Sequence, residues 1–569
     1  MSLSDDLLAA RAWLELDPDP LTRRQTLDLI AANDEARLRE CFAQRPGFGT
    51  AGIRAPIGPG PGCINRLVAR QTAAGLGAVL LETGPAQVVV GFDGRHGSRA
   101  FAQEIAAVLA AQGHTALLFP EECPTPLLAH ATLDLACQAG VMVTASHNPP
   151  GDNGIKVYGG DGAQIIPPLD RRIQLAIAEI AGTCPPVEAS EAREGPGRVL
   201  SVPAEQEQRY IEQVLALRVA PGTGLRCVYT PLHGVGWRSI ERLFAAAGQT
   251  LIPVPEQVEP DGDFPTVALP NPEEPGALDL AMALATREGA DLILANDPDG
   301  DRLAVALPSP EGGWRRLTGD EVGLLLAERL LSALSPGGPQ ALVVNTIVSS
   351  SLLADIAAAH GAACTQTLTG FKWLARAALD HDGPFVLGYE EALGYCVGEV
   401  VRDKDGLSAA LLMLDLAAEW APKGGLAAAL DDLARRYGAF VNAQKSITLP
   451  GLEGAARIRE RMAALRASPP AQIAGLEVLR LSDVWTSEER DLRSGQRLPL
   501  SLPRSDVLAF GLEGGSRVLV RPSGTEPKLK IYVEARSAWM EGEPVAQAWR
   551  RASQGSARLL AWADAWLAA

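Results

Sequence analysis

Short apolar segments alternate with segments of helical periodicity along much of this chain, and this alternation constrains the fold more than any other feature. A strand, a helix and a second strand in succession form a βαβ unit, which builds a mostly parallel sheet covered by helices. The first such stretch has expected strands at residues 87–93, 115–119 and 140–144, with a helix at residues 99–112. These residues predict an α/β domain with a mostly parallel sheet.

The same rhythm returns in two later stretches, followed by a different pattern. The second has strands at 225–230, 250–254 and 291–295 with a helix at 237–247, and the third has strands at 341–345 and 384–388 with helices at 319–331 and 352–360. After about residue 438 come strands at 476–481, 517–520 and 529–535 and a closing helix at 544–567. We expect three α/β domains in series, without a fixed solenoid period, and an α+β domain at the end.

A chain of 569 residues is too long for a single hydrophobic core. We expect a helical extension at residues 1–45, α/β domains at 46–203, 204–317 and 318–437, and the α+β domain at 438–569. Pro18 and Pro20 interrupt the helical pattern of the extension, which predicts two short helices packed outside the first domain. Asp19 is expected to cap the second helix, because proline is tolerated in a first helical turn.

The charge balance excludes a general polyanion-binding surface. Lys and Arg number 51 and Asp and Glu 68, which gives a net charge of −17. Nucleic acid is therefore not an expected partner. The sequence has no long uninterrupted apolar stretch and no basic-then-apolar start, so we expect no membrane partner and a cytoplasmic protein.

Cysteine and histidine are not arranged as metal ligands. The eight cysteines contain no C-x-x-C pair, which argues against a zinc site and a disulfide framework and predicts reduced thiols. The seven histidines show neither H-x-x-x-H nor H-E-x-x-H spacing. Any metal is therefore expected to be bound by oxygen.

The first loop with chemical potential, residues 144–149 (T-A-S-H-N-P), follows an expected buried strand. A serine at the carboxyl end of such a strand is well placed to act as a nucleophile or to carry a phosphoryl group, and Lys156 follows closely. The alternative is that Ser146, Asn148 and Pro149 simply form a turn.

The second loop, residues 296–302 (N-D-P-D-G-D-R), also follows an apolar strand. In an extended loop, Asp297, Asp299 and Asp301 would point to one side and would repel one another without a hard cation. An EF-hand is excluded, because Arg302 and Pro308 occupy the positions of its usual Gly and Glu. We expect a Mg²⁺ site with coordination positions left for a phosphate oxygen; the alternative is a solvated acidic turn.

The third loop, residues 388–395 (G-Y-E-E-A-L-G-Y), places two acids between glycines. Carboxylates accept paired hydrogen bonds from neighbouring hydroxyls, so this loop suits a sugar, although capping of a helix by one Glu explains it equally well.

The fourth loop, residues 521–528 (R-P-S-G-T-E-P-K), combines Arg521 and Lys528 with hydroxyl groups and a glycine. This composition favours a cradle for a phosphate that is held and not broken. The alternative is a polar turn between strands.

Together the loops resemble the α-D-phosphohexomutase superfamily, the phosphoglucomutases and phosphomannomutases, from about Phe48 onward. The matching segments, in the family's order, are G-T-A-G-I-R (49–54) and the four loops above. The segments D-F-P-T (263–266), T-G-F-K (369–372) and D-K-D-G (403–406), with the N-terminal helical segment, look most like the branch of bacterial α-phosphoglucomutases and animal phosphoglucomutase/phosphopentomutases. One departure is Ala392, where a serine often contacts the sugar.

The resemblance implies an α/β fold in which three similar α/β domains with mixed sheets and a C-terminal α+β domain surround a central cleft. Ser146 would carry the phosphoryl group, and Asp297, Asp299 and Asp301 would hold Mg²⁺ together with a phosphoserine oxygen of Ser146. The charge stabilisers and candidate acid/base residues would be Arg54, His147 and Lys156. Glu390 would bind the sugar hydroxyls. The phosphate that does not react would be held by Arg521, Ser523, Gly524, Thr525 and Lys528.

The expected activity is interconversion of glucose 1-phosphate and glucose 6-phosphate through a phosphoserine enzyme and a glucose 1,6-bisphosphate intermediate. Mg²⁺ and glucose 1,6-bisphosphate as primer are the expected cofactors, sugar phosphates the expected partners, and a monomer or homodimer the expected assembly. Phosphomannomutase or phosphopentomutase activity by the same mechanism is the alternative. Two alternatives lie outside the mutases: a phosphatase that uses the same phosphoserine chemistry, and a non-catalytic sugar-phosphate-binding protein.

Overall fold

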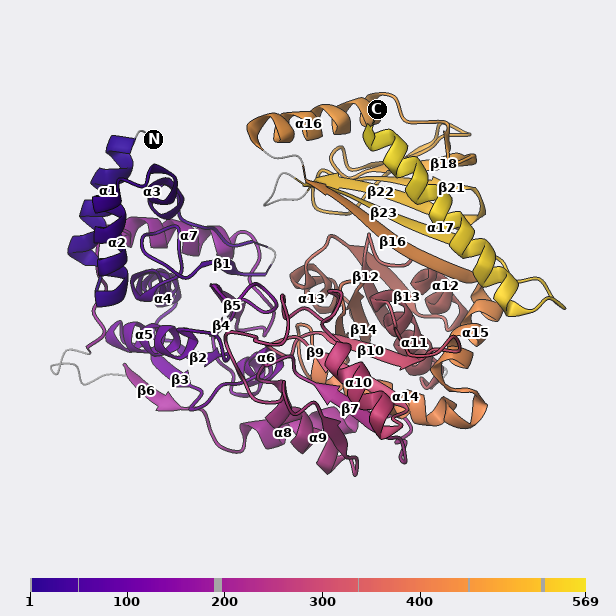
Figure 1. Ribbon diagram of the computed structural model, residues 1–569, viewed down its shortest axis with the longest axis horizontal. Coiled ribbons are helices and arrows are strands. Elements are labelled where there is room, and N and C mark those ends of the chain that lie inside the picture. The colour runs from indigo at the N-terminus through magenta and orange to yellow at the C-terminus, as the bar shows by residue number, and fades with distance from the viewer. Residues whose placement is uncertain are drawn as a thin grey trace. The chain divides into compact units, whose positions relative to one another are not determined.

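The structure is a computed structural model that describes residues 3–49, 51–188, 197–335, 337–448, 451–522 and 528–568 (Figure 1). The chain divides into two compact units. Unit 1 consists of Met1–Gly319, Gly370–Asp380 and Phe385–Ala418, and unit 2 of Asp320–Thr369, His381–Pro384 and Glu419–Ala569.

Three helices begin unit 1, where two were predicted. They are α1 (Leu3–Leu16), α2 (Pro20–Ala32) and α3 (Glu35–Phe42). The predicted cap of α2 is confirmed, since Asp19 accepts a hydrogen bond from the Leu21 amide at 2.9 Å. The missed break lies at Asn33, which adopts a left-handed conformation, and Asp34, whose carboxylate caps α3. Trp13 and Leu38 belong to the same buried core as the first domain, so this extension is part of that domain's packing and does not lie outside it.

The first domain has a six-stranded mixed sheet in the order β1-β5-β4-β2-β3-β6. Its strands are β1 (Ile53–Pro56), β2 (Gln87–Phe92), β3 (Thr115–Leu118), β4 (Ala139–Val143), β5 (Asp152–Gly159) and β6 (Arg198–Ser201). β4, β2 and β3 run parallel, as predicted, and β6, which was not predicted, extends them in parallel. β5 and β1 add an antiparallel edge that the sequence did not predict. Helices α4 (Arg66–Leu81), α5 (Ser98–Ala111) and α7 (Leu169–Ile180) cover one side, and α6 (Thr125–Asp134) covers the other (Figure 1).

The second domain has a five-stranded sheet in the order β11-β10-β9-β7-β8. Its strands are β7 (Cys227–Thr230), β8 (Leu251–Pro253), β9 (Leu292–Asn296), β10 (Leu303–Pro308) and β11 (Trp314–Arg316), and its helices are α8 (Gln206–Ala216), α9 (Gly236–Ala246) and α10 (Asp279–Glu288). β7, β8 and β9 are parallel, and β10 and β11 are antiparallel. Every residue of β9 is buried, so the strand delivers the acidic loop from the middle of the sheet.

The elements of the third stretch divide between the two units. Unit 1 contains α13 (Phe371–Leu379), the antiparallel pair β14 (Phe385–Glu390) and β15 (Gly394–Val397), and most of α14 (Gly406–Trp420). Unit 2 contains the parallel pair β12 (Leu342–Thr346) and β13 (Ala363–Thr367), with α12 (Leu352–Ala359) and most of α11 (Gly319–Ser332).

The C-terminal part of unit 2 is an α+β domain, as predicted. Its antiparallel sheet follows the order β16-β23-β22-β21-β18-β19-β20, with β17 (Gln472–Ile473) beside β18. The strands are β16 (Ala439–Thr448), β18 (Leu476–Asp483), β19 (Glu488–Asp491), β20 (Arg497–Pro499), β21 (Leu508–Leu512), β22 (Arg517–Pro522) and β23 (Lys528–Ser537). The helices are α15 (Gly425–Tyr437), α16 (Gly451–Ala467) and α17 (Val545–Ala568), of which α17 crosses one face of the sheet (Figure 1). Leu559 and Ala563 of α17 pack there against Ile531 and Val533 of β23.

None of the helices in the described ranges combines the length and apolar character needed to cross a lipid bilayer.

Candidate active site

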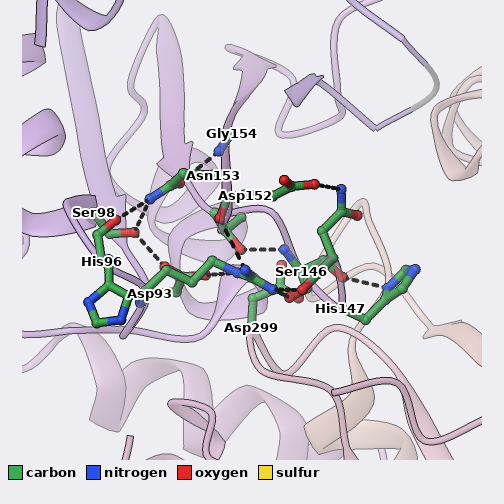
Figure 2. Close-up of polar contacts among 12 residues, drawn as sticks. Asp93, His96, Ser98, Ser146, His147, Asp152, Asn153, Gly154 and Asp299 are labelled. Carbon is green, nitrogen blue, oxygen red and sulfur yellow. Dashed lines mark hydrogen bonds and ion pairs between the residues drawn. The ribbon is translucent and has the colours of Figure 1, made fainter. Parts of the chain in front are cut away.

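Ser146 lies two residues beyond Thr144, directly after the fully buried strand β4. Its backbone adopts a left-handed conformation with φ of 53°, and its amide donates a hydrogen bond to the Thr144 hydroxyl at 2.8 Å. The Ser146 hydroxyl donates to Asp297 Oδ2 at 2.6 Å. It also lies 3.0 Å from His147 Nδ1 (Figure 2). The serine loop therefore places its hydroxyl directly against the acidic loop.

The three aspartates converge through a turn, which corrects the expectation of an extended loop. Gly300 has φ of +72°, and its amide donates to the Asp297 carbonyl at 2.9 Å, closing a turn between them. One side-chain oxygen from each of Asp297, Asp299 and Asp301 lies within 4.8 Å of the others, and all three residues are buried. The close approach of the carboxylates follows from this turn and not from the alternation of side chains along an extended strand.

Two buried lysines partly neutralise this acidic cluster. Lys156 Nζ on β5 lies 2.7 Å from Asp299 Oδ2 and 2.8 Å from Asp301 Oδ2, and Lys404 Nζ lies 3.1 Å from Asp301 Oδ2. Burial opposes the charge of Lys156, but Asp299 and Asp301 outweigh it and raise the pKa of the ammonium. Burial likewise acts against ionised Asp301, yet Lys156 and Lys404 hold the pKa of that carboxyl far below its usual range.

The acidic cluster fits a divalent cation. Within the part of the chain that the structure describes, Asp299 Oδ1 and Asp301 Oδ1 are buried and accept no hydrogen bond. Burial raises the pKa of Asp299, and the neighbouring Asp301 charge adds to this rise. An all-carboxylate ligand set with unpartnered oxygens is what Mg²⁺ prefers.

Arg54 and Arg302 lie close enough to His147 to act on its charge. Arg54 donates to Asn148 Oδ1 at 3.0 Å, and the Arg302 amide donates to Asp297 Oδ1 at 2.9 Å. Burial, with Arg302 and Arg54 adding positive charge, lowers the pKa of His147 well below its usual value. These surroundings favour the neutral form of the imidazole.

The third loop lies beside the acidic loop in unit 1. Arg302 donates to the Ala392 carbonyl at 2.8 Å, and the Leu303 amide donates to the Leu393 carbonyl at 3.0 Å. Glu390 ends β14, and its Oε1 accepts a hydrogen bond from the Gly370 amide at 2.7 Å. Burial raises the pKa of Glu390. The structure thus groups Glu390, Arg302 and the aspartate cluster, as a sugar site beside a metal site would require.

The fourth loop belongs to unit 2. Arg521 on β22 donates to the Thr369 hydroxyl, and its Nε is buried without a partner among the described residues. Lys528 begins β23, opposite Thr448. Ser523, Gly524 and Thr525 lie outside the described residues, so their predicted role stays a prediction.

The site contains polar residues that sequence analysis did not select. Thr125, at the start of α6, donates through its hydroxyl to Asp299 Oδ2 at 2.7 Å. Lys404 had been noted only as part of a family segment, although a lysine between two aspartates is a signal for a buried ion pair. Arg95 contacts the serine loop. A signal in the sequence was available, because Arg95 follows the buried strand β2 just as Ser146 follows β4 and Asp297 follows β9.

Comparisons with known proteins cover most of the chain. Three alpha/beta/alpha domains of the phosphoglucomutase/phosphomannomutase family match residues 45–182, 208–311 and 318–437, and the family's C-terminal domain matches residues 456–541.

Relatives with different substrate names are similarly close. The protein named "Probable phosphomannomutase" in Haemophilus influenzae is 40% identical over 83% of this chain and 93% of its own length. The "Probable phosphoribomutase" of Schizosaccharomyces pombe is 38% identical over 93% of both chains, and the phosphoglucomutase of Staphylococcus epidermidis is 35% identical over 85% of this chain and 90% of its own.

A solved structure has the same fold. The open form of the Paramecium phosphoglucomutase parafusin has a TM-score of 0.69 at 18% identity and covers 92% of this chain and 96% of its own. The four matched domains and the relatives above 30% identity together show the family. The chain belongs to the α-D-phosphohexomutase superfamily and is a phosphohexomutase, an isomerase of sugar phosphates.

Proposed function

We propose that this enzyme is a phosphoglucomutase that interconverts glucose 1-phosphate and glucose 6-phosphate through phosphorylated Ser146. The observation that carries the proposal is the 2.6 Å contact between Ser146 Oγ and Asp297 Oδ2, in a buried cluster of three aspartates. A serine in this position can hold a phosphoryl group next to a cation that offsets its charge.

Each half-reaction moves one phosphoryl group. In the first, the bond between phosphorus and Ser146 Oγ breaks, a bond to the free hydroxyl oxygen of the sugar phosphate forms, and the hydroxyl proton passes, in net terms, to Ser146 Oγ. In the second, the other phosphate of the sugar bisphosphate returns to Ser146 Oγ by the reverse exchange. The intermediate must turn over between the two steps without leaving the enzyme.

His147 is the proposed proton carrier for the serine oxygen. Its Nδ1 lies 3.0 Å from Ser146 Oγ, and its pKa is lowered because burial and two arginines disfavour the charged form. A neutral imidazole at this distance can take the proton of Ser146 Oγ when the oxygen attacks phosphorus, and can return it when the phosphoryl group leaves.

Asp297, Asp299 and Asp301 would hold Mg²⁺ together with an oxygen of phosphoserine 146. Bound there, the ion supplies charge neutralisation for the phosphoryl group in transfer. Lys156 is then a charge stabiliser, because its ammonium is already engaged by two of the aspartates. Arg54 is suited to the transferred group, since its Nε is buried and unpartnered among the described residues.

Glu390 is proposed to bind the sugar hydroxyls, and Arg521, Ser523, Gly524, Thr525 and Lys528 to bind the phosphate that is not being transferred. The raised pKa of Glu390 results mainly from burial, which a hydroxyl ligand donating to the carboxylate would offset. Arg521 is half-buried and contributes a buried Nε that has no partner within the described part of unit 2.

A pentose phosphate is the second candidate substrate. The family resemblance implies a serine that contacts the sugar at the position of Ala392, and alanine has no hydroxyl to make that contact. The name of the Schizosaccharomyces pombe relative refers to a phosphoribomutase, and that relative matches 93% of both chains. Mannose phosphate stays an alternative because of the Haemophilus influenzae relative.

The test of substrate is a comparison of kcat/KM for glucose 1-phosphate, mannose 1-phosphate and ribose 1-phosphate, with Mg²⁺ and glucose 1,6-bisphosphate present. We expect glucose 1-phosphate to be preferred by about tenfold or more, since a sugar that leaves a polar group of the pocket unpaired is discriminated against at least that strongly. Preference for ribose or mannose would overturn the glucose assignment and keep the mechanism. Release of inorganic phosphate in place of isomer would indicate a phosphatase.

Ser146→Ala tests the phosphoserine role. We expect the variant to lose most mutase activity, because no side-chain oxygen remains to carry the group. Ser332→Ala, at the solvent-exposed end of α11, is the control and should retain activity. Near-normal turnover by Ser146→Ala would exclude Ser146 as the carrier, and a binding protein without activity would show no turnover in any form.

The assembly, location and domain limits are further proposals. We propose a monomer or homodimer in the cytoplasm, with domains at residues 46–203, 204–317, 318–437 and 438–569 after the helical extension at 1–45. Light scattering and limited proteolysis of the whole chain test the assembly and the domain limits.

A further inference from the structure

Arg95 lies in the loop after β2 and contacts the segment that contains the serine loop through both terminal nitrogens of its guanidinium group. Its Nη1 donates to the carbonyls of Pro149 at 2.8 Å and Asp152 at 3.1 Å, and its Nη2 donates to the carbonyls of Ser146 and Asn148, both at 2.5 Å. Only 4% of the Arg95 surface is exposed. One buried side chain thus binds four carbonyls of a seven-residue segment that includes the proposed phosphoryl carrier.

This contact compensates for an unfavourable backbone conformation. Ser146 has φ of 53°, in the left-handed region that non-glycine residues rarely adopt and that persists only where the surroundings impose it. The fork of a guanidinium can serve four carbonyls at once, whereas the three donors of a lysine ammonium radiate from one point. The conformation of the Ser146 loop therefore depends on an arginine in particular.

Arg95 is itself fixed in place. Asp93 accepts a hydrogen bond from the Arg95 amide at 3.1 Å, and its Oδ2 lies 3.5 Å from Arg95 Nε. Asp93 also accepts from the Ser98 hydroxyl at 2.6 Å, and Asn153 donates to that hydroxyl at 2.9 Å (Figure 2). These bonds join the β2 loop to β5 and fix the backbone from which the Arg95 side chain extends.

A ring from the second domain covers the guanidinium. The Arg95 Cζ atom lies 4.9 Å from the centroid of the Phe264 ring, within the range of a cation–π contact. Phe264 is 2% exposed and has φ of 47°, an unusual conformation for a bulky residue. The loops also approach closely at Gly94, where an added Cβ would lie 2.8 Å from the Pro260 side chain.

The segment that carries Phe264 is tied to the acidic loop. The Phe264 amide donates to the Asp261 carbonyl at 3.2 Å, and the Asp261 amide donates to the His233 carbonyl at 3.0 Å. Two residues further along, the Val235 amide donates to the Pro298 carbonyl at 2.8 Å, inside the acidic loop. A continuous set of contacts in unit 1 therefore joins Arg95 to the proposed metal-binding turn.

We propose that Arg95 is a positioning residue for the mutase reaction, which holds Ser146 in its left-handed conformation and, through Phe264, keeps the serine loop in register with the acidic loop. The guanidinium acts on backbone carbonyls, one of them that of Ser146. The inference rests on the proposed function of Ser146 as phosphoryl carrier.

The test compares Arg95→Lys with the matched control Arg99→Lys. Arg99 Cζ also lies 4.9 Å above a phenylalanine ring, that of Phe92, but its side chain pairs with Glu121 and Glu122 at the surface. We expect Arg95→Lys to lower kcat by about 10²-fold, the cost of misplacing a reacting group by about 1 Å. KM should stay within about twofold, because substrate contacts are retained. Arg99→Lys should keep the wild-type kcat.

Phosphorus NMR of phosphoserine and thermal unfolding separate positioning from a loss of folded protein. We expect phosphorylated Arg95→Lys to show a shifted or broadened phosphoserine signal at a temperature where the protein is fully folded. Wild-type kcat and signal in this variant would overturn the inference, and so would a loss of kcat that tracks the unfolded fraction.

Phe264→Leu provides an independent variant if Arg95→Lys does not fold. It removes the ring face and keeps an apolar side chain, and we expect kcat to fall about fivefold, for loss of one buried cation–π contact. Unchanged kcat in Phe264→Leu would contradict the link between the two loops. Absence of phosphoserine at position 146 in the wild-type enzyme would instead refute the proposed function, so the two failures are distinguishable.

Discussion

Replacing Lys156 by methionine removes the cation that bridges two buried aspartates while keeping the volume of its stem. Removal of one partner from a buried ion pair costs about 3–5 kcal/mol, because it leaves a charge uncompensated. Lys404 remains 3.1 Å from Asp301 Oδ2, so the loss falls mainly on Asp299, which keeps the Thr125 hydroxyl at 2.7 Å. We therefore expect the low end, about 3 kcal/mol, which corresponds to about 10²-fold more frequent opening of the surrounding structure.

Hydrogen exchange of the amides in β4 and β5 measures that opening directly, without assuming that the two units unfold together. In the presence of a chelator, exchange in Lys156→Met should be about 10²-fold faster than in the wild type. Adding Mg²⁺ should narrow the difference, because aspartates without their ammonium partner bind a divalent cation more tightly. A cation at 100 times its Kd stabilises by about 2.7 kcal/mol.

Lys372→Met is the matched control, since Lys372 is also buried in unit 1 but donates to the Gly49 carbonyl at 3.2 Å. Burial lowers the pKa of Lys372, so its removal should cost little. The electrostatic account is refuted if Lys156→Met changes exchange by less than about threefold in chelator, or if Mg²⁺ protects it no more than the wild type.

Two further predictions concern other parts of the chain. Burial disfavours ionised Glu534, but Arg517 and the Ser350 hydroxyl outweigh burial and hold the pKa of Glu534 below its usual value. Glu534→Gln should therefore destabilise unit 2 by about 3–5 kcal/mol near pH 7. The difference from the wild type should shrink as the pH falls through the pKa of Glu534, where the wild type loses the same interaction, and a difference constant between pH 7 and pH 3 in chemical denaturation would contradict this. In Gly394→Ala the new Cβ would lie 2.5 Å from Lys404 Cδ and displace the ammonium from Asp301, so kcat should fall. Gly182→Ala is the control, because a Cβ added there meets no atom within 4 Å, and kcat should stay unchanged. Equal kcat in both alanine variants would exclude Lys404 from the site.

Parallel strands made of apolar runs were predictable from the sequence, whereas a strand that contains several polar residues was not. β2 and β4 consist of buried apolar residues and glycine after at most one polar residue, so they were found. β5 contains Asn153, Lys156 and Tyr158, which are all buried. Their polar groups form hydrogen bonds with side chains from distant parts of the sequence. Local sequence does not reveal such partners, and β5 was missed as a strand although Lys156 was selected as a site residue.

The candidate site was predictable where a loop follows a buried strand and carries its own chemistry. Ser146 and the three aspartates met that condition, and the structure brings them together. Arg95 did not, because its function depends on four carbonyls that lie more than fifty positions away. The turn at Gly300 was also missed, since alternate carboxylates suit an extended loop as well as a turn.

The central claim is that Ser146 carries the phosphoryl group during catalysis. Peptide mass spectrometry tests this claim directly. The enzyme is first treated with glucose 1,6-bisphosphate whose phosphates carry heavy oxygen, and is analysed again after the bisphosphate is replaced by glucose 1-phosphate, which offers a free hydroxyl group, with Mg²⁺. The account predicts one labelled phosphoryl group on the peptide that contains Ser146. It further predicts that this label passes to the sugar phosphate, and that an unlabelled phosphoryl group takes its place on Ser146, once the bisphosphate is removed and excess glucose 1-phosphate is added. A phosphoryl group on another residue, or turnover without any phosphoenzyme, would contradict the account.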